Sequence, residues 1–250
     1  MRRIPGRPGE TRETAKTASE EDPSPSAVIE SVVKGTPGTV IVAAGGSSFI
    51  VDPAQCEELG VDVASLAVGM PVDGGTASIL KLAAEAHEAE RRGLALLARA
   101  EQSSFMLRIK LEQRGFPGRA VGLALERLEA EGSLDDRRFA RAYASSRLER
   151  RVEGPASLEA ALRARGIAAD TAKEAIRAVL DPEARKTALA KAYQHELKRR
   201  RRVGARDGAD GGGGEEGSRI ESTSLEIRSA LRELGYSASE ITEFFENDQL

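Results

Sequence analysis

The chain has 250 residues, of which 40 % are hydrophobic and 31 % are charged, and its formal net charge at pH 7 is -3. Its one cysteine, Cys56, excludes an intramolecular disulfide and favours a reducing compartment. Because no apolar run has the length of a signal peptide or a membrane span, the sequence predicts a cytoplasmic protein that does not contact a membrane.

The small net charge conceals a strong segregation along the chain. Residues 1–90 carry a net charge of -7, residues 91–202 carry +11, and residues 203–250 carry -7. A basic middle in an acidic protein indicates a partner that is a polyanion or an acidic protein surface.

The N-terminal third combines a polar tail with a β-rich region. Residues 1–26 show no periodic apolar pattern and are predicted to be a disordered tail. Residues 27–78 contain short β-rich runs separated by Gly-rich turns, which predict a small antiparallel meander. Residues 53–59 are predicted to form a short helix, with Cys56 as a packing residue, and residues 68–72 another turn.

From Ile79 onward the pattern is helical, and it contains an internal repeat centred on Gly115, Gly166 and Gly235. Each glycine has hydrophobic residues eight and four positions before it, directly after it, and ten positions after it. The equivalent sets are Leu107, Leu158 and Ile227; Leu111, Leu162 and Leu231; Phe116, Ile167 and Tyr236; and Leu125, Ile176 and Phe245. This pattern predicts a helix, a left-handed glycine at its C-terminal end, and a second helix.

A third helix between successive copies makes each unit a three-helix repeat, so we predict a mainly α protein with an elongated helical array and a small N-terminal antiparallel β region. The predicted units are a linker helix with the first repeat at 79–133, the second repeat at 134–181 and the third at 182–250. The glycine-rich segment 203–220 is predicted to be a flexible insertion in the third repeat.

The stretch Leu134–Arg151 combines a helix start, a core stripe and a basic face. Asp135 is the expected N-cap, Asp136 favours the positive end of the helix dipole, and Leu134 and Phe139 are expected to close a hydrophobic staple. At about 100° per residue, Phe139 and Tyr143 share the packing face. The opposite face is expected to carry Arg137, Arg141 and Arg151, with Ala144 and Leu148 between them.

These residues resemble the RecX family, bacterial regulators of the RecA recombinase. The resemblance rests on Ser103–Phe116, on Gly132–Asp136 followed by Phe139, Ala140 and Tyr143, and on the helix that ends at Gly166-Ile167. The family motif of the chain is thus Leu134, Asp135, Asp136, Phe139, Ala140 and Tyr143. The resemblance implies a protein, predicted here to be a monomer, that binds the RecA filament along its groove and restrains strand exchange and ATP hydrolysis without catalysing a reaction.

Seven basic residues are the candidate contacts to the filament or to phosphates: Lys110, Arg114, Arg137, Arg138, Arg141, Arg147 and Arg151. We expect no catalytic residue, cofactor or metal, because no Walker, dinucleotide or nucleophile-elbow signature and no metal-ligand spacing occurs.

Two other readings stay open at this point. A general nucleic-acid-binding helical protein would contact phosphates, for example through the cationic run Lys198–Arg202, which is equally well explained as a solvated helix end. A scaffold that only holds partners would need no basic stripe.

Overall fold

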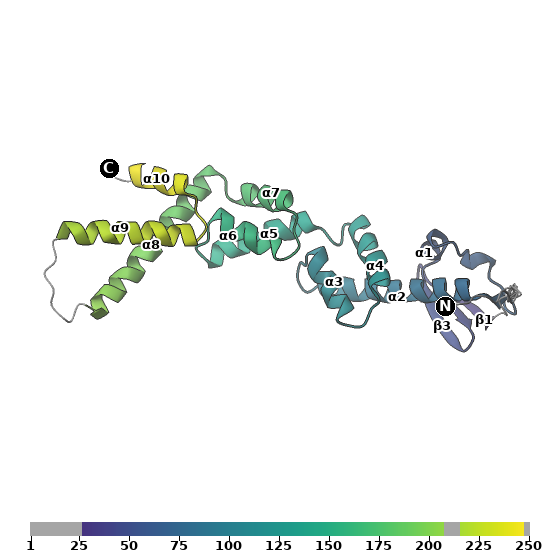
Figure 1. Ribbon diagram of the computed structural model, residues 1–250. Helices are drawn as coiled ribbons and strands as arrows, with labels where there is room; N and C mark the ends of the chain where they lie inside the picture. Colours follow the sequence, from purple (N-terminus) through teal and green to yellow (C-terminus); the bar gives the residue numbers. More distant parts are fainter. Residues whose placement is uncertain (1–26, 208–215, 248–250) are drawn as a thin grey trace, which may run out of the picture. The chain divides into compact units, whose positions relative to one another are not determined.

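The computed structural model describes residues 27–207 and 216–247, and it divides into two compact units, Met1–Lys81 and Leu82–Leu250. Figure 1 shows the strands in the N-terminal unit and the succession of helices that follows. The predicted tail at 1–26 lies outside the described residues. The mainly helical prediction with a small N-terminal sheet is confirmed.

The N-terminal unit is built on a four-stranded antiparallel sheet of order β3-β2-β1-β4. Its strands are β1 (Ala27–Lys34), β2 (Val40–Ala44), β3 (Ser47–Val51) and β4 (Pro71–Val72). The segment 68–72, predicted as a turn, turns at Gly69 and then pairs Pro71 and Val72 with the start of β1. The sequence prediction missed this short strand because a two-residue pairing is fixed by the neighbouring strand and not by local periodicity.

The helix α1 (Pro53–Glu58) follows the sheet, and a 3-10 turn (Val63–Ser65) comes after it. The Asp52 carboxylate accepts the backbone N–H of Ala54 at 2.9 Å and so caps α1. Cys56 is fully buried in this helix, and burial raises the pKa of its thiol to about 11. The thiol therefore stays protonated at neutral pH, as expected for a packing residue.

From Gly74 onward, nine helices follow in the described residues. They are α2 (Gly74–Leu97), α3 (Ser104–Glu112), α4 (Gly118–Ala130), α5 (Asp136–Arg150), α6 (Pro155–Arg163), α7 (Ala169–Val179), α8 (Pro182–Asp207), α9 (Glu216–Glu233) and α10 (Ala238–Asn247). The first of these starts before Ile79, because the Asp73 carboxylate accepts the N–H of Thr76 at 2.6 Å and caps the helix there.

Three successive hydrophobic cores confirm the tandem three-helix organisation. The first joins α3, α4 and the end of α2, the second joins α5, α6 and α7, and the third joins α8, α9 and α10. The three repeat glycines have φ of +89°, +81° and +94°. Each therefore ends a helix in the left-handed conformation that the repeat pattern predicts.

The third repeat is closed by aromatic side chains. Tyr193 contacts Phe244 and Phe245 with ring centroids 5.5 Å apart in each pair, and the Arg228 guanidinium lies 4.3 Å from the Phe245 ring. These tilted and edge-to-face ring contacts, with the cation–π contact of Arg228, add to the core of the third repeat.

The predicted insertion at 203–220 is longer than the structure allows. Helix α8 continues to Asp207 and α9 starts at Glu216, because residues such as Ala205, Arg206 and Ile220 propagate a helix well enough. The glycine run Gly211–Gly214, on which the predicted insertion rests, lies outside the described residues.

None of the described helices is both long enough and apolar enough to cross a membrane.

Candidate partner-binding site

The two acidic residues of the family motif cap two different helices. The Asp135 carboxylate accepts the backbone N–H groups of Arg137 and Arg138 at 2.8 and 3.1 Å, so it is the N-cap of α5, as predicted. The Asp136 carboxylate instead accepts the N–H and the hydroxyl of Ser104, each at 2.8 Å, and so holds the start of α3. The charge of the two carboxylates strengthens these four hydrogen bonds.

The start of α3 is also tied to the end of α6. The Ser103 hydroxyl accepts the N–H of Met106 and donates to the carbonyl of Arg165 at 2.7 Å. Ser103 is fully buried, so this serine is satisfied at both its donor and its acceptor. The motif therefore joins the first repeat to the second.

Leu134 and Phe139 do not form the predicted hydrophobic staple. A turn at Gly132 brings the Leu134 N–H to the carbonyl of Leu128 at 2.9 Å, and Leu134 packs in the first core, whereas Phe139 packs in the second. The predicted boundary between the first and second repeats falls just before Leu134. It therefore assigns this residue to the second repeat, although its side chain packs in the first core.

The buried stripe of α5 is centred on alanines. Ala140 and Ala144 are fully buried, Phe139 is 8 % exposed, and Leu148 packs against the second core, so Ala144 and Leu148 do not lie on the solvent side as predicted. Small side chains let α5 and α7 approach closely along this stripe, and hydropathy alone does not mark such a contact. Arg137 and Arg141 are still exposed, but they border the buried stripe and do not oppose it.

Tyr143 lies at the other border of the stripe. Its ring stacks on Phe139 with centroids 5.9 Å apart, and the guanidinium of Arg165 lies 4.4 Å from its centroid. Sequence reasoning did not single out Arg165, because the contact joins α5 to the turn after α6 and no local signal predicts it.

Two of the seven candidate basic residues hold the fold together. The Arg138 guanidinium binds the Glu101 carboxylate at 2.7 Å and the carbonyls of Gly132 and Ser133. The Arg147 guanidinium makes a two-bond pair with Glu153, at 2.6 and 3.0 Å. In each case the hydrogen bond to the carboxylate is the main cause that raises the arginine pKa. These two side chains fix loop geometry, and their predicted role as partner contacts stays a prediction.

Three others contact a neutral acceptor or lie farther from a carboxylate. Lys110 donates to the Gln102 amide oxygen, and Arg114 donates to the carbonyl of Lys110 at 2.6 Å. Arg151 lies beyond the last turn of α5 with extended backbone, 3.9 Å from Glu153, so helical periodicity does not set its direction as the sequence prediction assumed.

Arg137 and Arg141 remain as exposed cations one helical turn apart, and within residues 27–207 and 216–247 neither side chain forms a hydrogen bond or an ion pair. The same holds for further exposed cations of the second repeat that the candidate list omits: Arg150, Arg163, Lys173 and Arg177. The high net positive charge of residues 91–202 was the sequence feature that could have identified these four residues.

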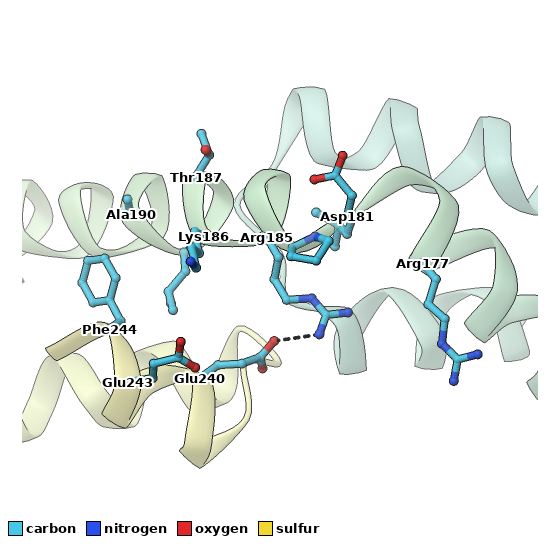
Figure 2. Close-up of a pocket in the computed structure, with 12 residues that line it drawn as sticks. Arg177, Asp181, Arg185, Lys186, Thr187, Ala190, Glu240, Glu243 and Phe244 are labelled. Carbon is cyan, nitrogen blue, oxygen red and sulfur yellow. Dashed lines mark ion pairs between the residues drawn. The ribbon is translucent and has the colours of Figure 1, made fainter. Parts of the chain in front are cut away.

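A cleft of about 1080 Å³ lies where α8 faces α10, and Figure 2 shows its lining. Arg185 and Glu240 point toward each other across it and form an ion pair at 3.3 Å. Asp181 and Glu243 add negative charge beside Lys186 and Arg177. Because the two signs are mixed, this cleft is a poorer polyanion site than the exposed arginines of α5.

No group of three or more His, Cys, Asp or Glu in the described ranges has the geometry to hold a metal ion. The exposed arginines of α5 carry the chemistry to recognise acidic groups.

The N-cap at Asp135 makes stability depend on pH. The N–H of Arg138, together with that of Arg137, lowers the pKa of the Asp135 carboxyl in the folded chain. The stabilisation is therefore fully present above the unfolded-state pKa of about 3.9 and is lost as the pH falls through the lower folded value.

We expect Asp135→Ala to reduce the free energy of unfolding by about 1 kcal/mol at pH 7 and by less at pH 3, as measured by urea unfolding. Asp170→Ala removes an exposed carboxylate from the first turn of α7 and should cost less at pH 7. An equal loss for Asp135→Ala at both pH values would contradict the capping assignment.

The comparisons with known proteins agree with this architecture. The family model described as RecX, second three-helix domain, matches residues 135–176, which begin at the N-cap of α5 and end within α7. The regulatory protein RecX of Thermus thermophilus is 40 % identical over 119 residues, a match that spans 46 % of this chain and 78 % of that protein. The regulatory protein RecX of Treponema pallidum is 38 % identical over 94 residues, spanning 38 % of this chain and 57 % of that protein.

Two solved structures share the fold. A crystal structure of regulatory protein RecX superposes with a TM-score of 0.64 at 18 % identity and covers 88 % of this chain and 99 % of its own. The RecX of Lactobacillus salivarius superposes with a TM-score of 0.52 at 16 % identity, covering 65 % of this chain and 96 % of its own. The first match covers more of this chain than residues 82–250 contain, so the likeness in fold extends into the N-terminal unit. On the sequence identity and the family model together, the chain belongs to the RecX family of regulatory proteins.

Proposed function

We propose that this chain binds the filament of the RecA recombinase and restrains its ATP hydrolysis and strand exchange, without catalysing a reaction itself. Family membership supports RecA as the partner. The observation that supports a binding surface is the pair Arg137 and Arg141, which project from the repeat matched by the family model and have no role in holding the fold.

The charge distribution supports the same conclusion. Residues 91–202 carry a net charge of +11 in a chain whose total is -3. Such a segment is attracted to an acidic protein surface or to the phosphates of filament-bound DNA, and the attraction is weakened by salt.

The test measures DNA-dependent ATP hydrolysis by the RecA of the same organism on single-stranded DNA, with this protein titrated in at moderate salt. We expect the rate to fall at amounts well below one protein per RecA subunit. An unchanged rate across the titration would overturn the proposed inhibition.

The double variant Arg137→Ala/Arg141→Ala is expected to weaken binding to the RecA filament by about tenfold or more while changing the unfolding free energy by less than about 0.5 kcal/mol. Exposed helix charges contribute little to folding, whereas arginines at a protein interface are frequent hot spots. Affinity is measured by fluorescence anisotropy of the labelled chain on preformed filaments.

The matched control is Arg91→Ala/Arg92→Ala, which removes the same charge from exposed positions of α2, where both side chains pair with Glu88. If the two double variants bind the filament equally well, the α5 pair is not the contact surface.

A second candidate function, phosphate binding to bare nucleic acid, is favoured by one observation. In the run Lys198–Arg202, Arg199 pairs with Glu196 and Arg200 with Glu226, but Lys198, Arg201 and Arg202 are exposed on α8. Binding to single-stranded DNA without RecA that weakens steeply with salt, together with no effect on ATP hydrolysis, would favour this function.

A further inference from the structure

The junction between successive repeats is itself repeated. The start of α3 packs on the Gly166 turn, where the Ser103 hydroxyl donates to the carbonyl of Arg165 at 2.7 Å. The start of α6 packs on the Gly235 turn, where the Gly154 N–H donates to the carbonyl of Leu234 at 2.6 Å. In both junctions a helix N-terminus donates to the carbonyl of the residue that precedes the repeat glycine.

The two junctions occupy equivalent sequence positions. Ser103 and Gly154 are 51 residues apart, as are Gly115 and Gly166. The second helix of each of these repeats, α3 or α6, therefore uses its N-terminus to bind the glycine turn of the next repeat.

Both occupied turns are packed without spare room. A Cβ atom at Gly166 would overlap the Phe105 side chain, and a Cβ atom at Gly235 would lie 2.5 Å from the backbone nitrogen of Ser157. A Cβ atom at Gly154 would overlap the Gly235 backbone. Close backbone approach is thus a shared property of these junctions.

The third repeat does not offer a helix N-terminus at the equivalent position. The position equivalent to Ser103 and Gly154 is Thr223, which lies seven residues inside α9. Backbone N–H groups inside a helix are already bonded to the preceding turn, so this position has no N-terminal donors to offer.

Within residues 82–207 and 216–247, the Gly115 turn of the first repeat, Arg114–Phe116, is a copy of the same docking surface without an equivalent occupant. Apart from Gly115 and its two chain neighbours, no heavy atom of this range lies within 4 Å of a Cβ built on Gly115, and the Arg114 carbonyl accepts no hydrogen bond from it. A carbonyl at the C-terminal end of a helix is an acceptor that a partner can use. The exposed side chains of Arg114 and Arg119 place positive charge beside it.

We propose that the Gly115 turn binds the N-terminus of a helix from the partner protein, with a small residue at its N-cap and acidic residues in its first turn. The two occupied junctions define the small N-cap and the donor groups, because Ser103 and Gly154 are the residues that fit there. The flanking arginines select acidic residues, and the positive end of the partner helix dipole faces the carbonyls of the turn. The proposal rests on the proposed function, in which the partner is a RecA subunit of the filament.

The test compares Gly115→Asn with Gly132→Asn in the full chain. Both glycines have positive φ, +89° and +71°, and both have open space where a Cβ would stand. Asparagine tolerates this conformation, so both variants should fold and melt alike. The side chain introduced by Gly115→Asn would project into the docking surface, as the Phe105 contact shows for a Cβ at the equivalent Gly166.

We expect Gly115→Asn to weaken binding to preformed RecA filaments by about tenfold or more, and Gly132→Asn to stay within about twofold of the parent chain. Equal binding of the two variants, with the parent bound, overturns the docking proposal and leaves the proposed function standing. A parent chain that does not bind filaments overturns the proposed function, and this docking proposal with it. If sedimentation shows that Gly115→Asn instead abolishes self-association of the parent, the occupant is a second copy and the proposed partner is wrong.

Discussion

Gly166→Ala is expected to destabilise the helical repeats by about 2–5 kcal/mol, whereas Gly115→Ala, at the equivalent position of the first repeat, should cost only about 1–2 kcal/mol. Both glycines have positive φ, so both variants carry the penalty of a Cβ in the left-handed region. Only at Gly166 does the new methyl group also overlap Phe105, and forcing atoms into a packed contact adds a cost of about 1–3 kcal/mol.

Urea unfolding followed by helical circular dichroism measures both free energies. The Phe105→Ala background provides the control, since removing that ring should reduce the cost of Gly166→Ala to about that of Gly115→Ala. If Gly166→Ala and Gly115→Ala are equally destabilising in the parent background, the junction between the first and second repeats is not packed as described.

Phe139→Ala is expected to reduce the free energy of unfolding by about 3–5 kcal/mol. The ring is 8 % exposed, packs in the core shared by α5, α6 and α7, and stacks on Tyr143 at 5.9 Å between centroids. Its removal leaves a cavity that the surrounding helices fill only in part. Thermal and urea unfolding give the free energy.

The control for this prediction is Leu225→Ala, which truncates a side chain of α9 that is 69 % exposed and should cost less than about 1 kcal/mol. A melting curve of Phe139→Ala that matches the parent would show that this face of α5 is not the core. The Arg137→Ala/Arg141→Ala variant is expected to show the reverse behaviour, with binding lost and stability kept, so the two changes separate the packing side of α5 from its binding side.

Local signals predicted the elements and the repeat. Alternating apolar residues, helix periodicity and the glycines that follow it are properties of neighbouring positions, and they predicted the β-rich start, the helix pairs around Gly115, Gly166 and Gly235, and the cap at Asp135. The sequence resemblance also named the family, because its motif is contiguous along the chain.

The candidate site stays a prediction, since a charged residue can be located from sequence but its partner cannot. Arg138 and Arg147 were expected to contact a partner, yet each is held by a carboxylate of the same chain. Arg137 and Arg141 are exposed as predicted, and their role in binding stays a prediction.

The sequence by itself determined which segments are helical or β-rich, which residues repeat, and the cap at Asp135, because these follow from interactions within a few residues. Its motif also determined which family the chain resembles. Only the tertiary structure decided that Asp136 caps a helix starting 32 residues earlier, that Leu134 and Phe139 belong to different cores, and that Ala144 is buried. It alone also showed that two of the three glycine turns are filled and that the Gly115 turn is open. Contacts between distant residues depend on how the helices pack, and packing is set by the shapes of whole surfaces that no local pattern contains.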